Sequence, residues 1–542
     1  MTQCRSVDRL LDRRGVNRPS VTLSAITVCR ELLGARTRED HKKRKGRPSH
    51  GSHDTLLELN SNSSGSYLAI DLGAESGRAL LGRLRAGILT VTEIHRFANQ
   101  PVRDSRALRW NVPRLWEEIR TALSLTKKVA LNGVGVDAWG VDYALLGADG
   151  NLIENPYHYR DARTNGVMEQ LFRLVPKEEI YSTTGIQFMP INTLFQLFAH
   201  LRDAPGILQA ASKLLTIPDL FHFWLTGKAA CEYTNASTTQ MVNPVTRAWA
   251  GELMHRLNLP TALPAEIVES GSILGTLANS ATSVIAPASH DTASAVAAIS
   301  AHGSTAFLSS GTWSLVGTEL SAPLINAETL RLNFTNEGGA NGTTMLLKNV
   351  MGLWILQGCR RSWAAAGHEY PYADLMEAAA HEPGFRCLMD PDHEAFLNAE
   401  DMPKAIAQFC RSTDQPAPTS PGSFTRAVLE SLALKYRLVI GNLEHVTGRA
   451  IEQIRVIGGG SKNRLLNQFT ADATGRRVLA GPAEATALGN IAVQMIATGR
   501  AGSLKEAREI IDRSFPVETF EPHDTNSWDV AAARFQQYCD HT

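Results

Sequence analysis

The chain has 542 residues, enough for two to four domains with hydrophobic cores of ordinary size. Hydrophobic residues make up 43% and charged residues 20%, and no apolar run approaches the roughly 18 residues that a membrane-spanning helix requires, so we expect a globular protein without a membrane partner. The 54 basic and 54 acidic residues balance, which argues against a broadly cationic nucleic-acid binder.

Cysteine usage indicates a reducing compartment. The seven cysteines are scattered from Cys4 to Cys539, no two of them have CxxC spacing, and their number is odd. Such a set indicates neither a zinc site nor a disulfide framework. We therefore expect a cytoplasmic protein.

Residues 1–65 differ in composition from the rest of the chain. They contain 13 basic and 7 acidic residues, a net charge of +6, and run into the polar tract NSNSSGS. Such a segment cannot bury much apolar surface, which is typical of a disordered extension. A nucleic-acid-binding arm, a targeting peptide and a start codon assigned too far upstream are the alternatives. The segment lacks the apolar core of a secretory signal.

The first ordered feature expected is a hairpin. Apolar, strand-like runs at 67–70 and 79–84 flank a short segment that contains Gly73 and Gly77. Glycines remove side-chain bulk where an anion could approach the open backbone N–H groups of such a turn. A phosphate-binding turn is the functional interpretation, and a plain glycine-rich hairpin is the alternative.

Two charged residues at this turn suit a bound nucleotide. Arg78 could add a charge-assisted contact to a phosphate. Asp71, at the end of a buried strand, is the kind of carboxylate that holds a hydrated Mg²⁺. The segment is neither GxxxxGK[ST] nor GxGxxG, so the two commonest nucleotide loops are excluded here.

The catalytic residues are expected where an apolar strand at 284–289 ends. His290 and Asp291 follow this strand, and small residues able to start a helix come after them. A carboxylate at a helix N-terminus is stabilised in its ionised form. Asp291 could therefore act as a general base that takes a proton from a substrate hydroxyl during phosphoryl transfer, with His290 as a positioning donor. An aspartate that merely caps the helix is the alternative.

Two further turns resemble the first in construction. Strand-like runs at 305–308 and 313–317 flank a Ser-Ser-Gly-Thr turn, which predicts a second hairpin of the phosphate type. A strand at 454–457 leads into three glycines and then a helix from Asn463, a turn that lets backbone approach a flat ligand such as adenine. Paired hairpins far apart in sequence predict two related lobes that face one nucleotide.

The segment 135–143 places two carboxylates and two aromatic side chains around a glycine. Aromatic rings and hydrogen-bond acceptors suit a polyol, which has a carbon face and several hydroxyls. A β-bulge with a buried tryptophan is the alternative.

Nine motifs occur in an order that resembles a known family. They are AIDLGAESGRALLG, GVDAWGVDYALL, YHYRDART, YTNASTTQ, ASHDTASAV, LSSGTWSLVG, FTNEGGANG, LKNVMGLWILQ and VIGGGSKNRLLNQFTADATG. Over about residues 66–525, the chain resembles the FGGY carbohydrate kinases, and within them the rhamnulokinases most. The DLG and SGR elements alone would indicate only the broader actin/sugar-kinase/Hsp70 fold.

The resemblance implies an α/β fold of two ribonuclease-H-like domains around a nucleotide cleft. The expected division is a basic extension at 1–65, a sugar-binding N-terminal domain at 66–303, an ATP-binding C-terminal domain at 304–525 and a C-terminal helix or tail at 526–542. It also implies transfer of the ATP γ-phosphoryl group to O1 of L-rhamnulose, with Mg²⁺, by a monomer or weak homo-oligomer. The alternatives are a kinase for fuculose, xylulose or a signalling polyol, and a non-catalytic actin-like ATP-binding protein.

The resemblance also assigns site residues. Asp291 would be the proton acceptor and Asp71 the residue near the metal. The implied ATP contacts are Ala74, Glu75, Ser76, Gly77, Arg78, Thr312, Gln357 and Gly459. The implied sugar contacts are Gly140, His290, Asp291, Thr292 and Asn349.

Two positions depart from the family pattern. Ala138 stands where a hydroxyl residue is common, which removes a potential hydrogen bond to the sugar, and Glu75 places a carboxylate in the phosphate turn, facing solvent or a metal-bound water.

Overall fold

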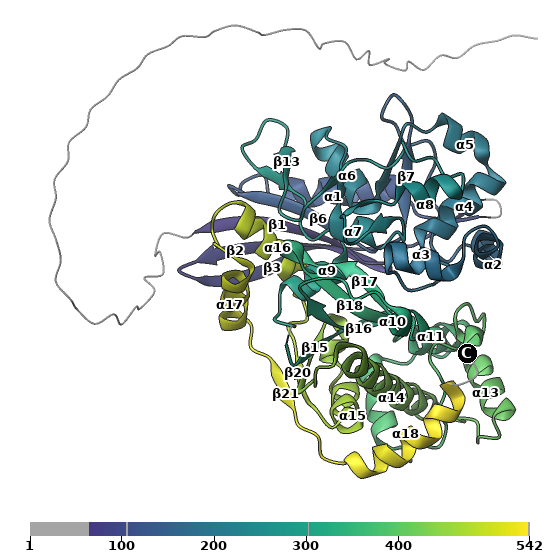
Figure 1. Cartoon of the computed structure of the whole chain (residues 1–542). Helices are drawn as coiled ribbons and strands as arrows, with labels where there is room; N and C mark the ends of the chain where they lie inside the picture. The colour runs from purple at the N-terminus through teal and green to yellow at the C-terminus, as the bar shows by residue number, and fades with distance from the viewer. Residues whose placement is uncertain (1–63, 105–106, 302, 540–542) are drawn as a thin grey trace, which may run out of the picture. The chain divides into compact units, whose positions relative to one another are not determined.

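The structure is a computed structural model that describes residues 64–104, 107–301 and 303–539, and every structural statement below concerns these residues (Figure 1). The expected N-terminal extension lies outside them except for its last two residues. No helix in the described ranges is both long and apolar enough to cross a membrane.

The N-terminal lobe is built on a mixed sheet. In spatial order its strands are β13 (Ile273–Thr276), β14 (Ser283–Ile285), β6 (Gly133–Ala138), β1 (Gly65–Leu72), β2 (Ser76–Arg85) and β3 (Ile88–Ala98). β1 and β2 pair antiparallel, which confirms the first predicted hairpin, and β6 and β14 extend the sheet with parallel strands. The pairing sets Asp71 opposite Arg78 on one side and Asp137 on the other.

The C-terminal lobe repeats this plan. In spatial order its strands are β17 (Thr335–Gly338), β18 (Thr344–Met351), β16 (Trp313–Leu320), β15 (Thr305–Ser310), β19 (Gln453–Ile457), β20 (Arg477–Ala480) and β21 (Glu518–Phe520). β15 and β16 form the second predicted hairpin, and β19 and β20 add parallel strands. An antiparallel hairpin extended by parallel strands in both lobes is the expected two-domain α/β architecture.

Helices pack around the two sheets, and short strands outside these sheets form separate two-stranded pairs. In the N-terminal lobe the helices are α1 (Val112–Leu125), α2 (Val167–Phe172), α3 (Lys177–Thr184), α4 (Thr193–Asp203), α5 (Pro205–Ala210), α6 (Ile217–Thr226), α7 (Tyr233–Ser237), α8 (Gly251–Arg256) and α9 (Asp291–Ala297). They are followed by α10 (Ala327–Arg331), α11 (Trp354–Ala365), α12 (Tyr372–His381), α13 (Met402–Ser412), α14 (Pro421–Thr447), α15 (Arg464–Thr474), α16 (Ala485–Ala497), α17 (Leu504–Ser514) and α18 (Thr525–Cys539). The short strands are β4 (Val102–Asp104), β5 (Ala107–Arg109), β7 (Tyr143–Leu146), β8 (Lys213–Thr216), β9 (Cys231–Glu232), β10 (Val242–Asn243), β11 (Ala248–Trp249) and β12 (Ile267–Val268).

The last part of the chain returns to the first sheet. α16 and α17 follow β20 in sequence, yet they lie beside β1 and β3 in Figure 1, and their apolar side chains share one buried cluster with residues of β1 and α9. In α16, Asn490 donates to the Asp137 carboxylate at 2.5 Å, and Gln494 donates to the Leu68 carbonyl at 3.1 Å. Two helices that come late in the chain, α16 and α17, therefore pack against the sheet of the N-terminal lobe.

Helices α9 and α16 cross at Gly489. A Cβ atom at this glycine would lie 1.7 Å from the carbonyl oxygen of Ser294, so only glycine permits the close approach. Because the clash is with backbone, we expect Gly489→Ala to destabilise the fold by about 1–3 kcal/mol and to lower the thermal midpoint. Gly441→Ala is the matched control: it is also in a helix, a Cβ there meets nothing within 4 Å, and it should raise the midpoint slightly. Equal midpoints for Gly489→Ala and the parent would contradict this packing.

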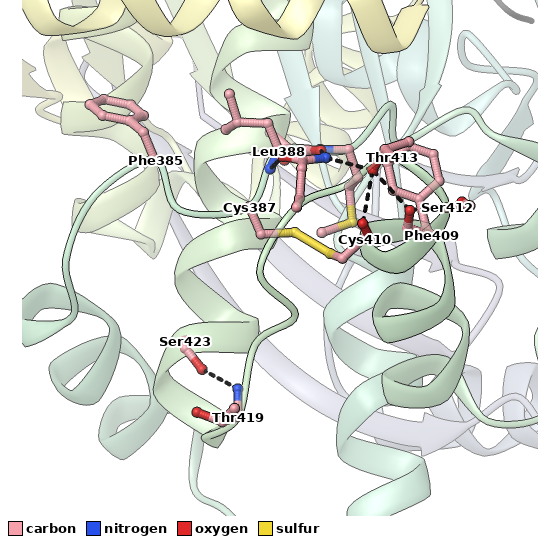
Figure 2. The surroundings of a disulfide bond; sticks show 12 residues. Phe385, Cys387, Leu388, Phe409, Cys410, Ser412, Thr413, Thr419 and Ser423 are labelled. Atoms are coloured by element: carbon pink, nitrogen blue, oxygen red, sulfur yellow. Dashed lines mark hydrogen bonds between the residues drawn. A yellow bond between two sulfur atoms is a disulfide. The ribbon is translucent and has the colours of Figure 1, made fainter.

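One expectation from the sequence is wrong. Cys387 and Cys410 form a disulfide, which the scattered, odd-numbered cysteines did not indicate (Figure 2). Helix α13 carries Cys410 and packs against the loop that holds Cys387, which brings the two Cα atoms to 6.7 Å, within the usual range for a bridge. The residues are 23 positions apart, so tertiary packing alone makes this pair.

Candidate active site

A cavity of about 280 Å³ lies where the two lobes meet. Its walls come from the β1–β2 turn, the β15–β16 turn, the start of α9, the end of β19 and strands β17 and β18. Ten of the predicted site residues line it: Asp71, Ala74, Arg78, Gly140, His290, Asp291, Thr292, Thr312, Asn349 and Gly459. Segments more than 380 residues apart in sequence thus form one site.

The other predicted residues lie outside this lining. Glu75 is exposed, in keeping with a side chain that faces solvent. A Cβ at Gly77 would lie 2.3 Å from the ring of Phe97, so packing within the sheet already explains that glycine. Ser76 begins β2, and Gln357 lies on α11.

The turn between β15 and β16 is fixed by the start of α11. The backbone N–H groups of Leu353 and Trp354 donate to the carbonyls of Gly311 and Thr312 at 3.0 and 3.2 Å. Behind the turn, the hydroxyls of Ser314 and Tyr436 share a hydrogen bond of 2.7 Å. These contacts hold the turn in place, so its position in the cavity does not depend on a ligand.

Asp291 is the first residue of α9, and its neighbour His290 occupies the N-cap position, where no side chain caps the helix. The capping alternative is therefore wrong for Asp291. Its carboxylate lines the cavity, with 30% of the side chain exposed. Burial, reinforced by the charge of Asp71, raises the pKa of Asp291 to about 7. A carboxylate with such a pKa is matched to proton transfer near neutral pH.

The loop before Asp291 is held by a buried carboxylate from β9. Glu232 accepts from the backbone N–H of Ser289 at 2.9 Å, and from the hydroxyl of Thr234 at 2.6 Å. The Thr234 hydroxyl in turn accepts from the backbone N–H of His290 at 3.1 Å. Thr234 of the motif YTNASTTQ and Glu232, the residue before that motif, thus fix the backbone that presents His290 and Asp291.

His290 lies between two carboxylates. Its Nε2 is 3.4 Å from Oδ1 of Asp291, and its Nδ1 is 3.4 Å from Oε2 of Glu337. Burial lowers the pKa of His290 to about 4, so the imidazole is neutral at neutral pH. A neutral imidazole can donate through one nitrogen and accept through the other, as a positioning residue for hydroxyls requires.

The 135–143 segment divides into structural and cavity-facing residues. Asp142 is buried and accepts from the indole N–H groups of Trp110 and Trp139 at 2.6 and 3.0 Å and from Gln196 at 2.8 Å, so it holds the loop rather than a ligand. Trp139 and Gly140 line the cavity, as a polyol site requires.

Ala138 is fully buried and does not belong to the described residues that line the cavity. Its backbone N–H donates to the Ser289 carbonyl at 2.9 Å. The departure from the family pattern at this position therefore lies in the wall behind the site.

Two neighbouring carboxylates, Asp71 and Asp137, attract a divalent cation, and Arg78 neutralises part of the charge of the first. Arg78 donates to Asp71 at 2.5 Å and also pairs with Glu484. Asp137 lies beside Asp71 on the neighbouring strand, and its Oδ1 is buried with no hydrogen-bond partner among the described residues. Burial and the charge of Asp71 raise the pKa of Asp137 well above its ordinary range. An added positive charge would stabilise this pair of acids.

No cluster of three or more metal-ligating side chains occurs in the described part of the chain. Mg²⁺ is commonly held by one or two carboxylates together with waters and substrate phosphates rather than by a protein cage. Asp71, which lines the cavity, fits that arrangement, whereas Asp137 is fully buried behind it and adds negative charge.

Sequence reasoning missed several residues that line the cavity. They are Gln187, Asn192, Thr238, Thr335, Glu337 and Thr486. Glu337 lies within the recognised motif FTNEGGANG, so its place in that motif was the available signal. Thr335 lies in the same motif and Thr238 in YTNASTTQ, so the same signal was available for them, whereas Gln187, Asn192 and Thr486 lie outside the nine motifs and reach the cavity through the packing of helices and loops.

The comparisons with known proteins agree on one family. Residues 66–295 match the model of the N-terminal domain of the FGGY family of carbohydrate kinases, and residues 306–498 match that of its C-terminal domain. A rhamnulokinase from Bacteroides thetaiotaomicron is 45% identical over 482 residues, which covers 87% of this chain and 98% of that protein. One from Bacillus subtilis is 40% identical over 483 residues, again 87% and 98% of the two chains.

Solved structures share the fold at low identity. A gluconate kinase from Lactobacillus acidophilus superposes with a TM-score of 0.72 at 17% identity, covering 88% of this chain and 98% of that one. A xylulose kinase from the same organism gives 0.71 at 17% identity, covering 88% and 97%.

Proposed function

Because the chain belongs to the FGGY family of carbohydrate kinases, we propose that it transfers the γ-phosphoryl group of ATP to the O1 hydroxyl of L-rhamnulose, with Asp291 as the proton acceptor. The observation that carries this proposal is that the Asp291 carboxylate, whose pKa is raised to about 7, lines the same cavity as two phosphate-type turns. The rhamnulokinase relatives, matched over nearly their whole length, support L-rhamnulose as the sugar.

The residues supply the parts that phosphoryl transfer requires. Asp291 accepts the proton of the O1 hydroxyl as the new O–P bond forms and the bond to the β-phosphate oxygen breaks, which releases ADP. The turns at Ala74 and Thr312 and the glycine at Gly459 are the proposed ATP contacts. Asp71 would hold Mg²⁺, which neutralises phosphate charge when bound, and the charge of the buried Asp137 behind it would favour the cation. His290, Thr292, Gly140 and Asn349 orient the sugar, so that catalysis comes mainly from positioning.

The alternatives are open to a direct test. Purified enzyme is assayed with ATP and L-rhamnulose, L-fuculose or D-xylulose, with ADP release as the readout and phosphorus NMR to locate the ester. We expect the highest kcat/KM with L-rhamnulose, with the phosphate on C1. A preference for another ketose would assign a different sugar kinase. ATP binding without transfer to any sugar would indicate a non-catalytic ATP-binding protein, although such a protein has no need of a carboxylate with a raised pKa in a polar cavity.

The pH profile should follow the proposed base. Asp291 can accept a proton only when it is ionised, and its raised pKa lies at about 7. We therefore expect kcat/KM for the sugar, measured between pH 5.5 and 8.5, to rise with pH and level off above about 7.5. A flat profile across this range would contradict Asp291 as the base in the free enzyme.

A further inference from the structure

We infer that Glu337 is a sugar-binding residue that determines which ketose the enzyme accepts, by accepting a hydrogen bond from a hydroxyl other than the one that is phosphorylated. The inference rests on the proposed function and assigns a specificity residue to the C-terminal lobe. Glu337 lies on β17, is only 5% exposed and lines the cavity together with His290 and Asn349.

The carboxylate of Glu337 is only partly paired, although the side chain of Asn349 interacts with it. Its Oε1 has a long contact of 3.5 Å with the hydroxyl of Thr335, while its Oε2 is buried with no hydrogen-bond partner among the described residues. Oε2 lies 3.4 Å from Nδ1 of His290, and that nitrogen is also buried without a hydrogen-bond partner among the described residues. Because leaving buried polar groups unsatisfied is costly, a ligand hydroxyl that reaches the Glu337 carboxylate from the cavity would be favoured.

The geometry separates Glu337 from the reacting hydroxyl. Asp291 faces Nε2 of His290, whereas Glu337 faces Nδ1, and these two nitrogens point in different directions from the imidazole ring. The general base and Glu337 are therefore on different sides of His290. A ketose whose O1 lies at Asp291 would extend its remaining hydroxyls past the imidazole toward Glu337.

The structure also keeps Glu337 in place. Its strand pairs with β18, where Glu337 lies opposite Met345, and the next backbone N–H, of Gly338, donates to the Ser237 hydroxyl of the N-terminal lobe at 2.8 Å. A Cβ at Gly338 would lie 2.5 Å from the ring of Tyr233, which shows how closely β17 packs against α7. The acceptor is thus rigidly positioned across the junction of the lobes, as a group that discriminates between epimers must be.

A neighbouring polar network supports a sugar at this position. The side chain of Gln187 accepts from the backbone N–H of Asn349 at 2.8 Å and donates to the Asn349 carbonyl at 3.2 Å. The Asn349 side chain also donates to Gln187 at 3.2 Å, which orients it, and it lines the cavity with Glu337 on the C-terminal lobe and His290 on the other. A polyol bound here would contact both lobes, and a sugar without a hydroxyl at the Glu337 position would leave a buried acceptor unpaired.

The test is Glu337→Gln, which keeps the size of the side chain and removes the charged acceptor. Binding of L-rhamnulose and of ATP is measured separately by calorimetry, and kcat/KM is measured for L-rhamnulose and for its C3 and C4 epimers. We expect sugar affinity to fall at least 10-fold and ATP affinity to stay within 2-fold. The parent's preference for L-rhamnulose should shrink against one of the two epimers and persist against the other.

Glu118→Gln is the matched control, because this glutamate is also largely buried but pairs with His95 and Arg114 and is not among the residues that line the cavity. It should leave every binding constant unchanged. Sugar affinity within 2-fold of the parent in Glu337→Gln, or a general loss of stability with selectivity unchanged against both epimers, would overturn the inference. If the parent prefers another ketose, the proposed sugar is wrong, and the same comparison with that ketose and its epimers still tests Glu337.

Discussion

Replacing Asp291 with asparagine should reduce kcat for the sugar by roughly 10²–10⁴-fold, the usual contribution of a positioned general base. Asparagine has nearly the same size and can keep a hydrogen bond to the sugar, but it cannot take the hydroxyl proton. ATP affinity should change little, because the proposed nucleotide contacts lie on other segments. Steady-state kinetics and thermal melting of the same variant provide the measurement.

The thermal midpoint separates catalysis from folding. His290, not Asp291, occupies the N-cap of α9, so the asparagine variant should melt close to the parent. Asp374→Asn is the matched control, because Asp374 also lies in the first turn of a helix, α12, and is exposed; it should have normal turnover. An Asp291→Asn enzyme that melts normally and phosphorylates L-rhamnulose within a few-fold of the parent would remove Asp291 from the mechanism.

Gly459→Val should weaken ATP binding by roughly 10–100-fold, which corresponds to about 1–3 kcal/mol, the cost of forcing an overpacked contact. Gly459 follows β19, is exposed and lines the cavity where adenine is proposed to bind. A Cβ there meets no protein atom within 4 Å, so valine should fit the free protein and obstruct only a ligand. Sugar affinity in the absence of nucleotide should be unchanged.

This glycine is a better probe of the nucleotide site than Gly77. A side chain at Gly77 would meet Phe97, so a defect there would mix folding with binding. Gly441→Val on the exposed face of α14 is the control for Gly459→Val, since a side chain there also meets nothing within 4 Å. Unchanged ATP affinity in Gly459→Val would show that the adenine does not approach this turn.

Local sequence determined much of this protein. Alternating apolar runs and glycine turns predicted both hairpins, and the strand that ends at His290 and Asp291 was visible because an apolar run leads directly into polar and then small residues. The ordered motifs assigned the family. These features are encoded within a few residues of one another, where backbone preferences and hydrophobic pattern suffice.

Other features depended on contacts between distant segments. The pairing of Cys387 with Cys410, the return of α16 to the first sheet and the assignment of Asp142 to structure rather than sugar binding all arise from packing.

Glu337 shows the difference most clearly. Its motif was recognised in the sequence, yet only the register of β17 and the approach of the two lobes bring its carboxylate to 3.4 Å from His290. The sequence by itself determined the hairpins, the family and the residue proposed as the base. The tertiary structure decided that the Glu337 carboxylate lies at the cavity and that the Asp142 carboxylate is hydrogen-bonded within the protein. The reason is that burial and pairing depend on neighbours that lie far away along the chain.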